Sequence, residues 1–257
     1  MIDLHAHILP GLDDGPQTLA ESIKMCRIAC EDGIEKIVAT PHTKNGVYQN
    51  SREEILKAVT ELNNNLKNLN IPIHIYPGSD IRIDTDIFDL IDDNQLLTVN
   101  DNKRYIMIEF PEYIIPPQME EWIFKLKLKK ITPIFTHPER NMIIQKDLDI
   151  AYRLVENGGL IQITAMSLTN DWGKSVKKCA DELVKARLVH IIASDAHSPI
   201  KRPPILSRAL AVASELIGDE IEAKKLVTTI PQAIIDGTVY YPPDPVRKKT
   251  SFFKKFF

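Results

Sequence analysis

Short apolar runs rich in Ile and Val recur seven times along the chain, and this repetition constrains the fold more than any other feature. The runs cover residues 1–7, 36–40, 73–76, 105–109, 131–136, 160–164 and 189–193. Their nearly continuous apolar character is typical of parallel strands buried on both faces. Helical segments lie between them without an interrupting linker. The sequence therefore predicts an α/β fold in one domain, residues 1–245, arranged as a closed or nearly closed barrel of about seven strand–helix units.

Two of the intervening helices begin with a capping box. Thr18 is followed three positions later by Glu21, and Ser51 is followed in the same way by Glu54. In each pair, the two side chains cap each other's backbone N–H groups. Gly33 is typical of a helix end. The predicted helices cover residues 18–32, 51–68, 117–129, 147–157, 173–187 and 203–217.

Composition excludes several classes of protein. The formal net charge of −3 gives no electrostatic case for a nucleic-acid partner. Cys26, Cys30 and Cys179 have no disulfide-framework spacing, which favours free thiols in a reducing compartment. No apolar run approaches the ~20 residues of a membrane span, and no signal peptide is evident at the start. We therefore expect a cytoplasmic protein.

Histidines stand at the ends of the predicted strands. His5 and His7 alternate along the first strand, so their side chains leave the same face. His42, His137 and His197 each follow a later strand. In a βα barrel, the C-terminal ends of all strands open on one face, where active sites lie. We therefore expect these imidazoles to converge.

Carboxylates follow the same strand ends, and the combined set is too large for one tetrahedral zinc ion. The candidate ligands are His5, His7, His42, His137, His197, Asp80, Glu109, Asp195 and either Asp13 or Asp14. Mixed imidazole and carboxylate ligands suit several divalent ions that share bridging carboxylates, and Mn, Fe and Zn all fit. Taken singly, the residues have structural alternatives, since Asp13-Asp14-Gly15 is also a turn sequence and Asp80 and Glu109 also suit strand-end caps. Their joint placement favours a metal centre.

Several ordered segments carry a family resemblance. They are HAHILPGLDDGPQT, ATPH, YPGSDIRI, IEFP, FTHPERN, LIQITAMSLT and SDAHS-x-x-x-RPP. From residue 1 to about 240, they resemble the PHP (polymerase and histidinol phosphatase) superfamily. Within it, the chain is similar to the bacterial protein-tyrosine phosphatases encoded beside capsule and exopolysaccharide genes. The resemblance implies a distorted (β/α)7 barrel that holds three divalent metal ions, commonly manganese.

The resemblance also implies which ligands hold which ion. One ion would be held by His5, His7 and Asp195, a second by Glu109 and His137, and a third by Asp14, His42 and His197, with Asp80 bridging the first two. Relatives usually have Glu where this chain has Asp80, so a bridge here needs a small backbone shift or weaker occupancy of one ion. After SLT, relatives usually have Gly where this chain begins Asn170-Asp171-Trp172-Gly173.

Two arginines complete a phosphoryl-transfer site. Arg140 and Arg202 follow His137 and His197 on the same rim, and a guanidinium fork matches two phosphate oxygens. Arg82 fits a phosphate contact or a structural ion pair equally well. A site with several divalent ions lowers the pKa of bound water, so metal-bound hydroxide is expected to attack phosphorus.

The predicted activity is hydrolysis of phosphotyrosine, a phosphoric monoester hydrolase reaction. The resemblance implies a protein substrate, the tyrosine-rich tail of a membrane-associated bacterial tyrosine kinase that controls polysaccharide export. Spacing alone gives only phosphoester hydrolysis. Two alternatives remain open at this point, a small-molecule phosphatase of the histidinol-phosphate type and a metal-binding regulatory module without turnover.

The C-terminal residues 246–257 form a separate signal, because basic and aromatic pairs alternate there. One interpretation is a disordered, solubilising tail. The other is a weak anchor to a partner or to the inner face of the membrane, in which basic residues attract anionic lipid and Phe side chains insert.

Overall fold

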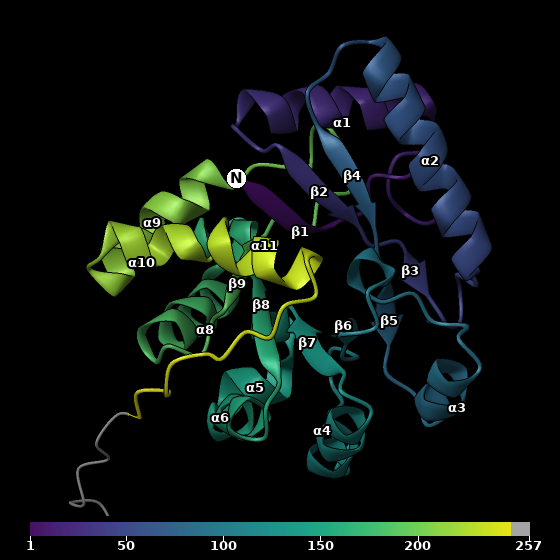
Figure 1. The fold of residues 1–257 in the computed structure, drawn as a ribbon. Helices are drawn as coiled ribbons and strands as arrows, with labels where there is room; N and C mark the ends of the chain where they lie inside the picture. The colour runs from purple at the N-terminus through teal and green to yellow at the C-terminus, as the bar shows by residue number, and fades with distance from the viewer. Residues whose placement is uncertain (248–257) are drawn as a thin grey trace, which may run out of the picture.

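The computed structural model describes residues 1–247, and its strands follow the rhythm seen in the sequence (Figure 1). All seven predicted strands are present, as β1 (Ile2–Ala6), β2 (Lys36–Ala39), β4 (His74–Pro77), β6 (Tyr105–Glu109), β7 (Thr132–Thr136), β8 (Leu160–Thr164) and β9 (Ile191–Ala193). Two further strands, β3 (His42–Thr43) and β5 (Asp80–Arg82), were not predicted. Their two and three residues are too few to show a period.

The strands form a ring of parallel pairs. One sheet has the order β1-β2-β4, and the other has the order β3-β5-β6-β7-β8-β9. Since β3 follows β2 and β5 follows β4 after short breaks, the two sheets are parts of one curved wall. Between β9 and β1, the wall is joined by the parallel bridge Ala6–Ala196 and by a 2.8 Å hydrogen bond from Asp195 N to His5 O. If β2 with β3, and β4 with β5, are each counted as one broken strand, the wall has seven strands. The fold is therefore the distorted seven-stranded barrel that the sequence predicted.

The distortion lies where β2 passes into β3 and β4 into β5. Gly78 permits a close approach there, because a Cβ atom on it would lie 2.7 Å from Val38 Cγ1. Pro41 has no N–H group to continue the ladder. Beyond the break, β3 pairs with β5 so that His42 lies opposite Asp80. The break therefore sets an imidazole beside a carboxylate at the C-terminal end of the barrel.

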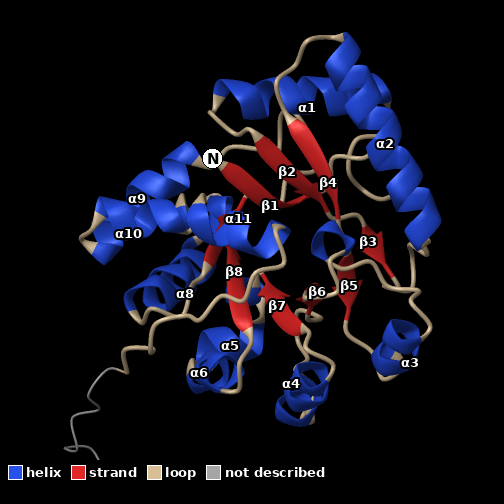
Figure 2. Ribbon diagram, in the orientation of Figure 1, coloured by secondary structure: helices blue, strands red, loops and turns tan. Residues whose placement is uncertain are grey.

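The helices surround the strands (Figure 2). Those that match predicted helices are α1 (Leu19–Glu31), α2 (Arg52–Asn68), α4 (Met119–Leu128), α6 (Asp149–Glu156), α8 (Lys174–Lys185) and α9 (Ser207–Ile217). Both predicted capping boxes are formed, on α1 and on α2. The elements that were not predicted are short. Five are helices of four to seven residues, namely α3 (Ile87–Asp92), α5 (Met142–Lys146), α7 (Ala165–Leu168), α10 (Glu220–Lys225) and α11 (Thr229–Ile235). Two are 3₁₀ turns of three residues, η1 (Val99–Asp101) and η2 (Pro138–Arg140).

The segment around α11 covers the N-terminal end of the barrel, opposite the polar strand ends. Tyr105, the first residue of β6, donates from its hydroxyl to Thr238 O (2.6 Å). Asn102 Nδ2 donates to Ile234 O in α11 (2.8 Å).

Within residues 1–247, no helix is long and apolar enough to cross a bilayer.

The last described residues lie against α6 and the C-terminal end of α8. Val246 N donates to Ala186 O, and Tyr152 in α6 donates to Val246 O, each at 2.8 Å. Arg247 pairs with Glu156, with 2.8 Å between Nη2 and Oε1. The rest of the predicted tail, residues 248–257, lies outside the described residues. The boundary at residue 245 stays a prediction.

Candidate metal centre

The predicted ligands come from six strand ends and meet in one cluster. Seven of the nine form three groups, in each of which the N and O ligand atoms all lie within 4.8 Å of one another, and His137 and Asp195 lie beside these groups. The groups are His7 with Asp14, His42 and His197; His5 with His7 and Asp80; and His42 with Asp80 and Glu109.

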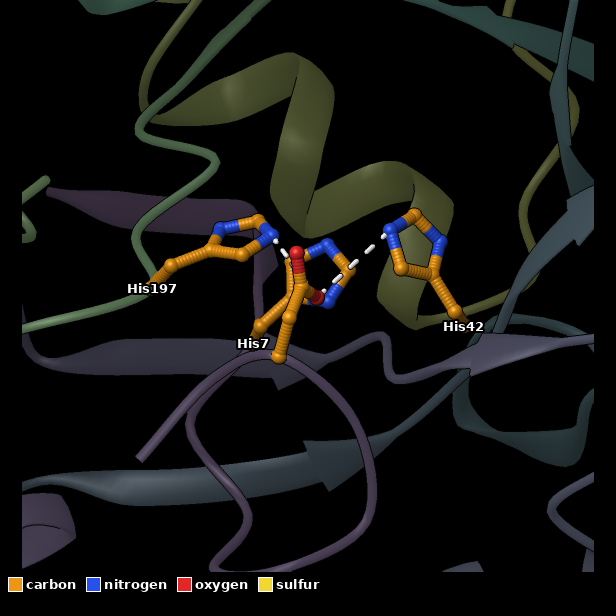
Figure 3. Close-up of side chains that lie close together, drawn as sticks. His7, His42 and His197 are labelled. Carbon is orange, nitrogen blue, oxygen red and sulfur yellow. Dashed lines mark ion pairs between the residues drawn. The ribbon is translucent and has the colours of Figure 1, made fainter. Parts of the chain in front are cut away.

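The first group lies nearest the surface and is drawn in Figure 3. His7 follows β1, His42 lies on β3 and His197 follows β9, and their rings lie close together with the His7 ring between the other two. The carboxylate of Asp14 closes the group, with Oδ1 3.4 Å from His197 Nε2 and 3.8 Å from His42 Nε2. The Asp14 side chain is half exposed, so this group opens to solvent.

The second group is fully buried. His5 Nε2 and His7 Nε2 are 3.2 Å apart. Asp195 Oδ1 lies 3.5 Å from the first nitrogen and 3.4 Å from the second, and Asp80 Oδ2 lies 3.7 Å from His5 Nε2. Asp195 therefore stands beside the group as a fourth donor.

The third group extends toward β6 and β7. Asp80 Oδ2 lies 3.6 Å from His42 Nδ1, and Glu109 Oε2 lies 3.9 Å from the same nitrogen. His137 Nε2 is 3.6 Å from Glu109 Oε1 and 3.9 Å from Asp80 Oδ2. Asp80 thus belongs to two of the three groups, although its side chain is one methylene shorter than that of Glu.

Asp13 and Asp14 have different positions, which answers the alternative that the sequence left open. Asp13 Oδ2 lies 2.5 Å from His7 Nδ1, the ring nitrogen that faces away from the cluster, and it also accepts from His42 N (3.0 Å). Gly15 N donates to Asp13 Oδ1 (2.9 Å). Asp13 therefore orients the His7 ring, as carboxylates commonly do behind metal-bound histidines, whereas Asp14 faces the cluster.

Two further orienting residues were missed from the sequence. Gln162 Oε1 lies 2.9 Å from His5 Nδ1, and Thr136 Oγ1 donates to Asp80 Oδ1 (3.1 Å). Both residues lie within predicted strands. A signal was available for Gln162, because it is a lone amide in the apolar run that forms β8.

Burial keeps most of the imidazoles neutral. It lowers the pKa of His5 to about 3 and that of His42 to about 4. Burial also opposes the charge on His7, but the carboxylates of Asp13 and Asp195 outweigh it and raise the pKa of His7 to about 10. Because metal ions bind neutral imidazole, metal binding at His7 would release a proton.

The residues fit divalent metal ions. Within residues 1–247, Asp80 Oδ2 and His42 Nδ1 are buried and have no hydrogen-bond partner. Buried polar atoms are normally paired, and burial together with the nearby Glu109 raises the pKa of Asp80 well above its usual range. A cation between these atoms would satisfy both of them. The mixture of nitrogen and carboxylate donors suits Mn, Fe or Zn.

The two predicted arginines lie together beside the cluster. Nη2 of Arg140 and Nη2 of Arg202 each lie 2.5 Å from Asp195 Oδ2, while the other oxygen of Asp195 faces the histidines. Burial would raise the pKa of Asp195, but Arg140, His7, His5 and Arg202 hold it well below the usual range. One carboxylate thus joins the arginine pair to the metal centre. Arg82, the third arginine considered, is exposed on β5 and has no ion pair among the described residues.

Two of the candidate ligands have left-handed backbones. His137 has φ 34° and Asp195 has φ 51°. Neither residue type is glycine, and such conformations persist only where the surroundings enforce them, commonly at functional sites. The strain coincides with the turns that lead from β7 and β9 into the cluster.

Comparison with known proteins places the chain in a family. The family model described as "Capsular polysaccharide synthesis, CpsB/CapC" matches residues 1–236. The chain belongs to the CpsB/CapC family. This membership confirms the family predicted from the sequence motifs.

Relatives in this family are named phosphatases. Tyrosine-protein phosphatase YwqE of Bacillus subtilis (strain 168) is 39% identical over 254 residues, 98% of this chain and 99% of that protein. Tyrosine-protein phosphatase CpsB of Streptococcus pneumoniae is 28% identical over 240 residues, 91% of this chain and 98% of that protein. A crystal structure from work on YwqE and CpsB, described as unique metal-dependent tyrosine phosphatases, matches with a TM-score of 0.92 and 39% identity over 97% of this chain and 100% of that one.

A more distant structure shares the fold. Histidinol phosphate phosphatase from Lactococcus lactis subsp. lactis matches with a TM-score of 0.54 and 16% identity, over 86% of this chain and 93% of that one. This likeness shows a shared fold alone and carries no statement on substrate.

In this CpsB/CapC family member, Gly15 provides a test of the orienting residues. A Cβ atom at Gly15 would lie 2.8 Å from His7 O and 2.9 Å from Asp13 Oδ1. Gly15→Ala must therefore displace the end of β1 or Asp13, and we expect metal affinity to fall about 10- to 100-fold, as for other losses of orienting contacts. Metal titration of the purified variant measures this.

Gly159→Ala is the matched control. At the opposite end of the barrel, a Cβ atom at Gly159 would lie 2.5 Å from Phe135 Cε2, so this variant is also overpacked. Both variants should have a lower melting temperature, but only Gly15→Ala should lose metal affinity. Equal metal affinity in the two variants would contradict the orienting role of Asp13.

Proposed function

We propose that this chain is a metal-dependent protein-tyrosine phosphatase, a phosphoric monoester hydrolase, which acts in capsular or exopolysaccharide synthesis. The observation that carries the proposal is the cluster in which three groups of imidazole and carboxylate donors adjoin two arginines on one carboxylate, Asp195. The phosphatase names of the full-length relatives support the same activity.

We propose three divalent ions, most readily Mn²⁺, since the donors form three groups and mix nitrogen with carboxylate oxygen. The ligands would be His5, His7, Asp14, His42, Asp80, Glu109, His137, Asp195 and His197. When bound, the ions would supply a nucleophilic oxygen near neutral pH and neutralise charge on the phosphoryl oxygens.

The protein's own residues position the substrate. Arg140 and Arg202 present guanidinium donors at the edge of the cluster, where they would bind the remaining phosphoryl oxygens and favour the charge that develops in the transition state. Asp195 holds both guanidinium groups on one side, so they share one direction. Asp13 holds the His7 ring, and Gln162 holds the His5 ring.

Phosphotyrosine suits this site. The phenol that leaves has a pKa of about 10, so its departure needs less acid assistance than that of an alkyl alcohol. The mouth is open at the half-exposed Asp14, which leaves room for a substrate attached to a protein. We propose the tyrosine-rich tail of a membrane-associated tyrosine kinase as that protein.

Steady-state kinetics test the function. Metal-loaded protein should hydrolyse a phosphotyrosine peptide with a clearly higher kcat/KM than histidinol phosphate. The reverse preference would indicate a small-molecule phosphatase. Absence of turnover of any aryl phosphate, in protein shown to contain metal, would indicate a regulatory module.

The tail supports a proposal of its own, based on sequence. Five basic residues from Arg247 onward would contribute about 1 kcal/mol each near anionic lipid. Arg247 is already paired with Glu156 and Asp149, so four remain for the membrane. We expect removal of residues 248–257 to leave aryl-phosphate hydrolysis unchanged and to reduce salt-sensitive co-sedimentation with anionic vesicles. Equal sedimentation of both forms would exclude the membrane role.

A further inference from the structure

One tryptophan lies over both arginines of the proposed phosphate site. Trp172 lies in the turn between α7 and α8, and its ring centroid is 4.2 Å from Arg140 Cζ and 5.2 Å from Arg202 Cζ. Cations within about 6 Å of an indole centroid are attracted to its face. Within residues 1–247, no other aromatic ring lies over two cations.

The turn fixes Trp172 from both sides. Asn170 and Gly173 have left-handed backbones, with φ 69° and φ 88°. Asp171 N donates to Met166 O at 3.0 Å, which ties the turn back to α7. The indole is nevertheless 37% exposed. The chain therefore places a large apolar ring at the mouth of the site instead of in the core.

Two guanidinium groups on one carboxylate oxygen repel each other, and Asp195 supplies only one negative charge for the two cations. Both Nη2 atoms bond Asp195 Oδ2, and the Nε atoms of Arg140 and Arg202 are buried without an acceptor among the described residues. The face of Trp172 carries partial negative charge but accepts no strong N–H hydrogen bond. The Nη2 groups are occupied, since Arg140 Nη2 also donates to Thr164 Oγ1 and Arg202 Nη2 to Asp195 O. The ring can attract both cations without taking up the remaining N–H donors, which stay available to phosphate oxygens. A second carboxylate would occupy those donors and cancel their charge.

Trp172 is partly exposed, so part of its side chain is open to a group that approaches the two arginines. In phosphotyrosine, one oxygen joins the phosphorus to the phenol ring, so a phosphate on Arg140 and Arg202 brings that ring next to Trp172. Aromatic pairs are favourable at centroid separations of about 4.5–7 Å. An alkyl phosphate offers no such ring.

We propose that Trp172 positions the Arg140–Arg202 pair for the phosphoryl group and contacts the aryl ring of the substrate, so that it favours aryl over alkyl phosphate monoesters. This inference rests on the proposed phosphatase function and adds a specificity-determining residue to it. Trp172 acts on the phosphate through the arginines, so its first role is that of a positioning residue.

Three substitutions separate these roles from a merely structural one. Trp172→Leu keeps apolar bulk in the turn, Trp172→Phe keeps an aromatic face, and Trp172→Ala removes both. Phe124→Ala is the matched control, since Phe124 is a 59% exposed aromatic residue on α4. Each metal-loaded protein is compared in its metal content, in its calorimetric dissociation constant for inorganic phosphate, and in kcat and KM for phosphotyrosine and phosphoserine peptides of one sequence.

We expect Trp172→Leu and Trp172→Ala to bind inorganic phosphate about tenfold more weakly, the size of a partly desolvated cation–π contact, with metal content unchanged. Their kcat/KM should fall further for phosphotyrosine than for phosphoserine, by about another tenfold, in line with one lost aromatic pair. Trp172→Phe should recover most of both losses. Phe124→Ala should match the wild type.

Wild-type phosphate affinity and peptide preference in Trp172→Leu would overturn the proposal. So would equal losses on the two peptides with unchanged phosphate affinity, which would show only a disturbed turn. The calorimetric measurement needs no turnover. A wild-type protein that binds phosphate through Trp172 but hydrolyses no aryl phosphate would therefore contradict the phosphatase function and not the positioning role.

Discussion

Asp80→Ala should lower the metal content of the protein and reduce kcat/KM by about a thousandfold. Lewis-acid stabilisation is worth several kcal/mol, and about 1.4 kcal/mol corresponds to a factor of ten in rate. Asp80 Oδ2 is buried within 4 Å of nitrogen atoms from His5, His42 and His137. Losing it removes the one carboxylate shared by two ligand groups. Metal analysis beside aryl-phosphate kinetics measures both effects.

Stability distinguishes this explanation from simple misfolding. Without metal, Asp80 is a buried carboxylate with an unpaired oxygen, so Asp80→Ala should leave the metal-free protein at least as stable as the wild type. With metal, the variant should gain less stability, because the stabilisation by a bound ligand rises with the logarithm of its affinity. Thermal unfolding with and without Mn²⁺ measures the direction of both changes in stability.

Asp80→Glu and Thr136→Val are the matched variants. Asp80→Glu keeps the carboxylate on a side chain one methylene longer, so we expect it to keep metal and activity. Thr136→Val removes only the hydrogen bond to Asp80 Oδ1 and should cost about 10- to 100-fold in metal affinity. Full metal content and rate in Asp80→Ala would show that another carboxylate joins the groups.

The sequence predicted the strands and the ligands for the same physical reason. Parallel strands buried on both faces read as apolar runs, so a polar residue at the end of a run stands out. His5, His42, His137 and Glu109 are all of this kind, and the barrel topology brings them to one face.

The features that the sequence did not predict depend on local backbone geometry, which leaves no repeating pattern of apolar and polar residues. The break that sets His42 opposite Asp80 depends on the close approach of Gly78 to Val38. Asp13 and Asp14 are neighbours in the chain and chemically identical, and only the turn that follows β1 directs one behind His7 and the other into the cluster.

The arrangement of Arg140 and Arg202 was likewise only partly predictable from the sequence. Their spacing from His137 and His197 placed them on the rim, but not on a common carboxylate. That sharing follows from the left-handed turn at Asp195, which directs one oxygen to the histidines and the other to both guanidinium groups.

Arg140→Ala should lower kcat/KM about 10²- to 10³-fold, the usual loss when one donor to a transition-state oxyanion is removed. Metal content should be kept, because Asp195 loses a cation that competes with metal ions for its carboxylate. Arg140→Lys should recover only part of the rate, since an ammonium group cannot form the two-point contact. Arg153→Ala on α6, which breaks an exposed ion pair with Glu120, is the control and should be active.

The double variant is the sharper test of a shared clamp. Both guanidinium groups bind Asp195 Oδ2 and would bind the same phosphoryl group, so their contributions should couple. The activation free energy that the double variant Arg140→Ala/Arg202→Ala loses should therefore differ from the sum of the losses in the two single variants, as expected for residues with a common partner. Strict additivity, or a rate that falls only in proportion to lost metal, would show that the arginines hold the ligand Asp195 and do not bind the phosphate.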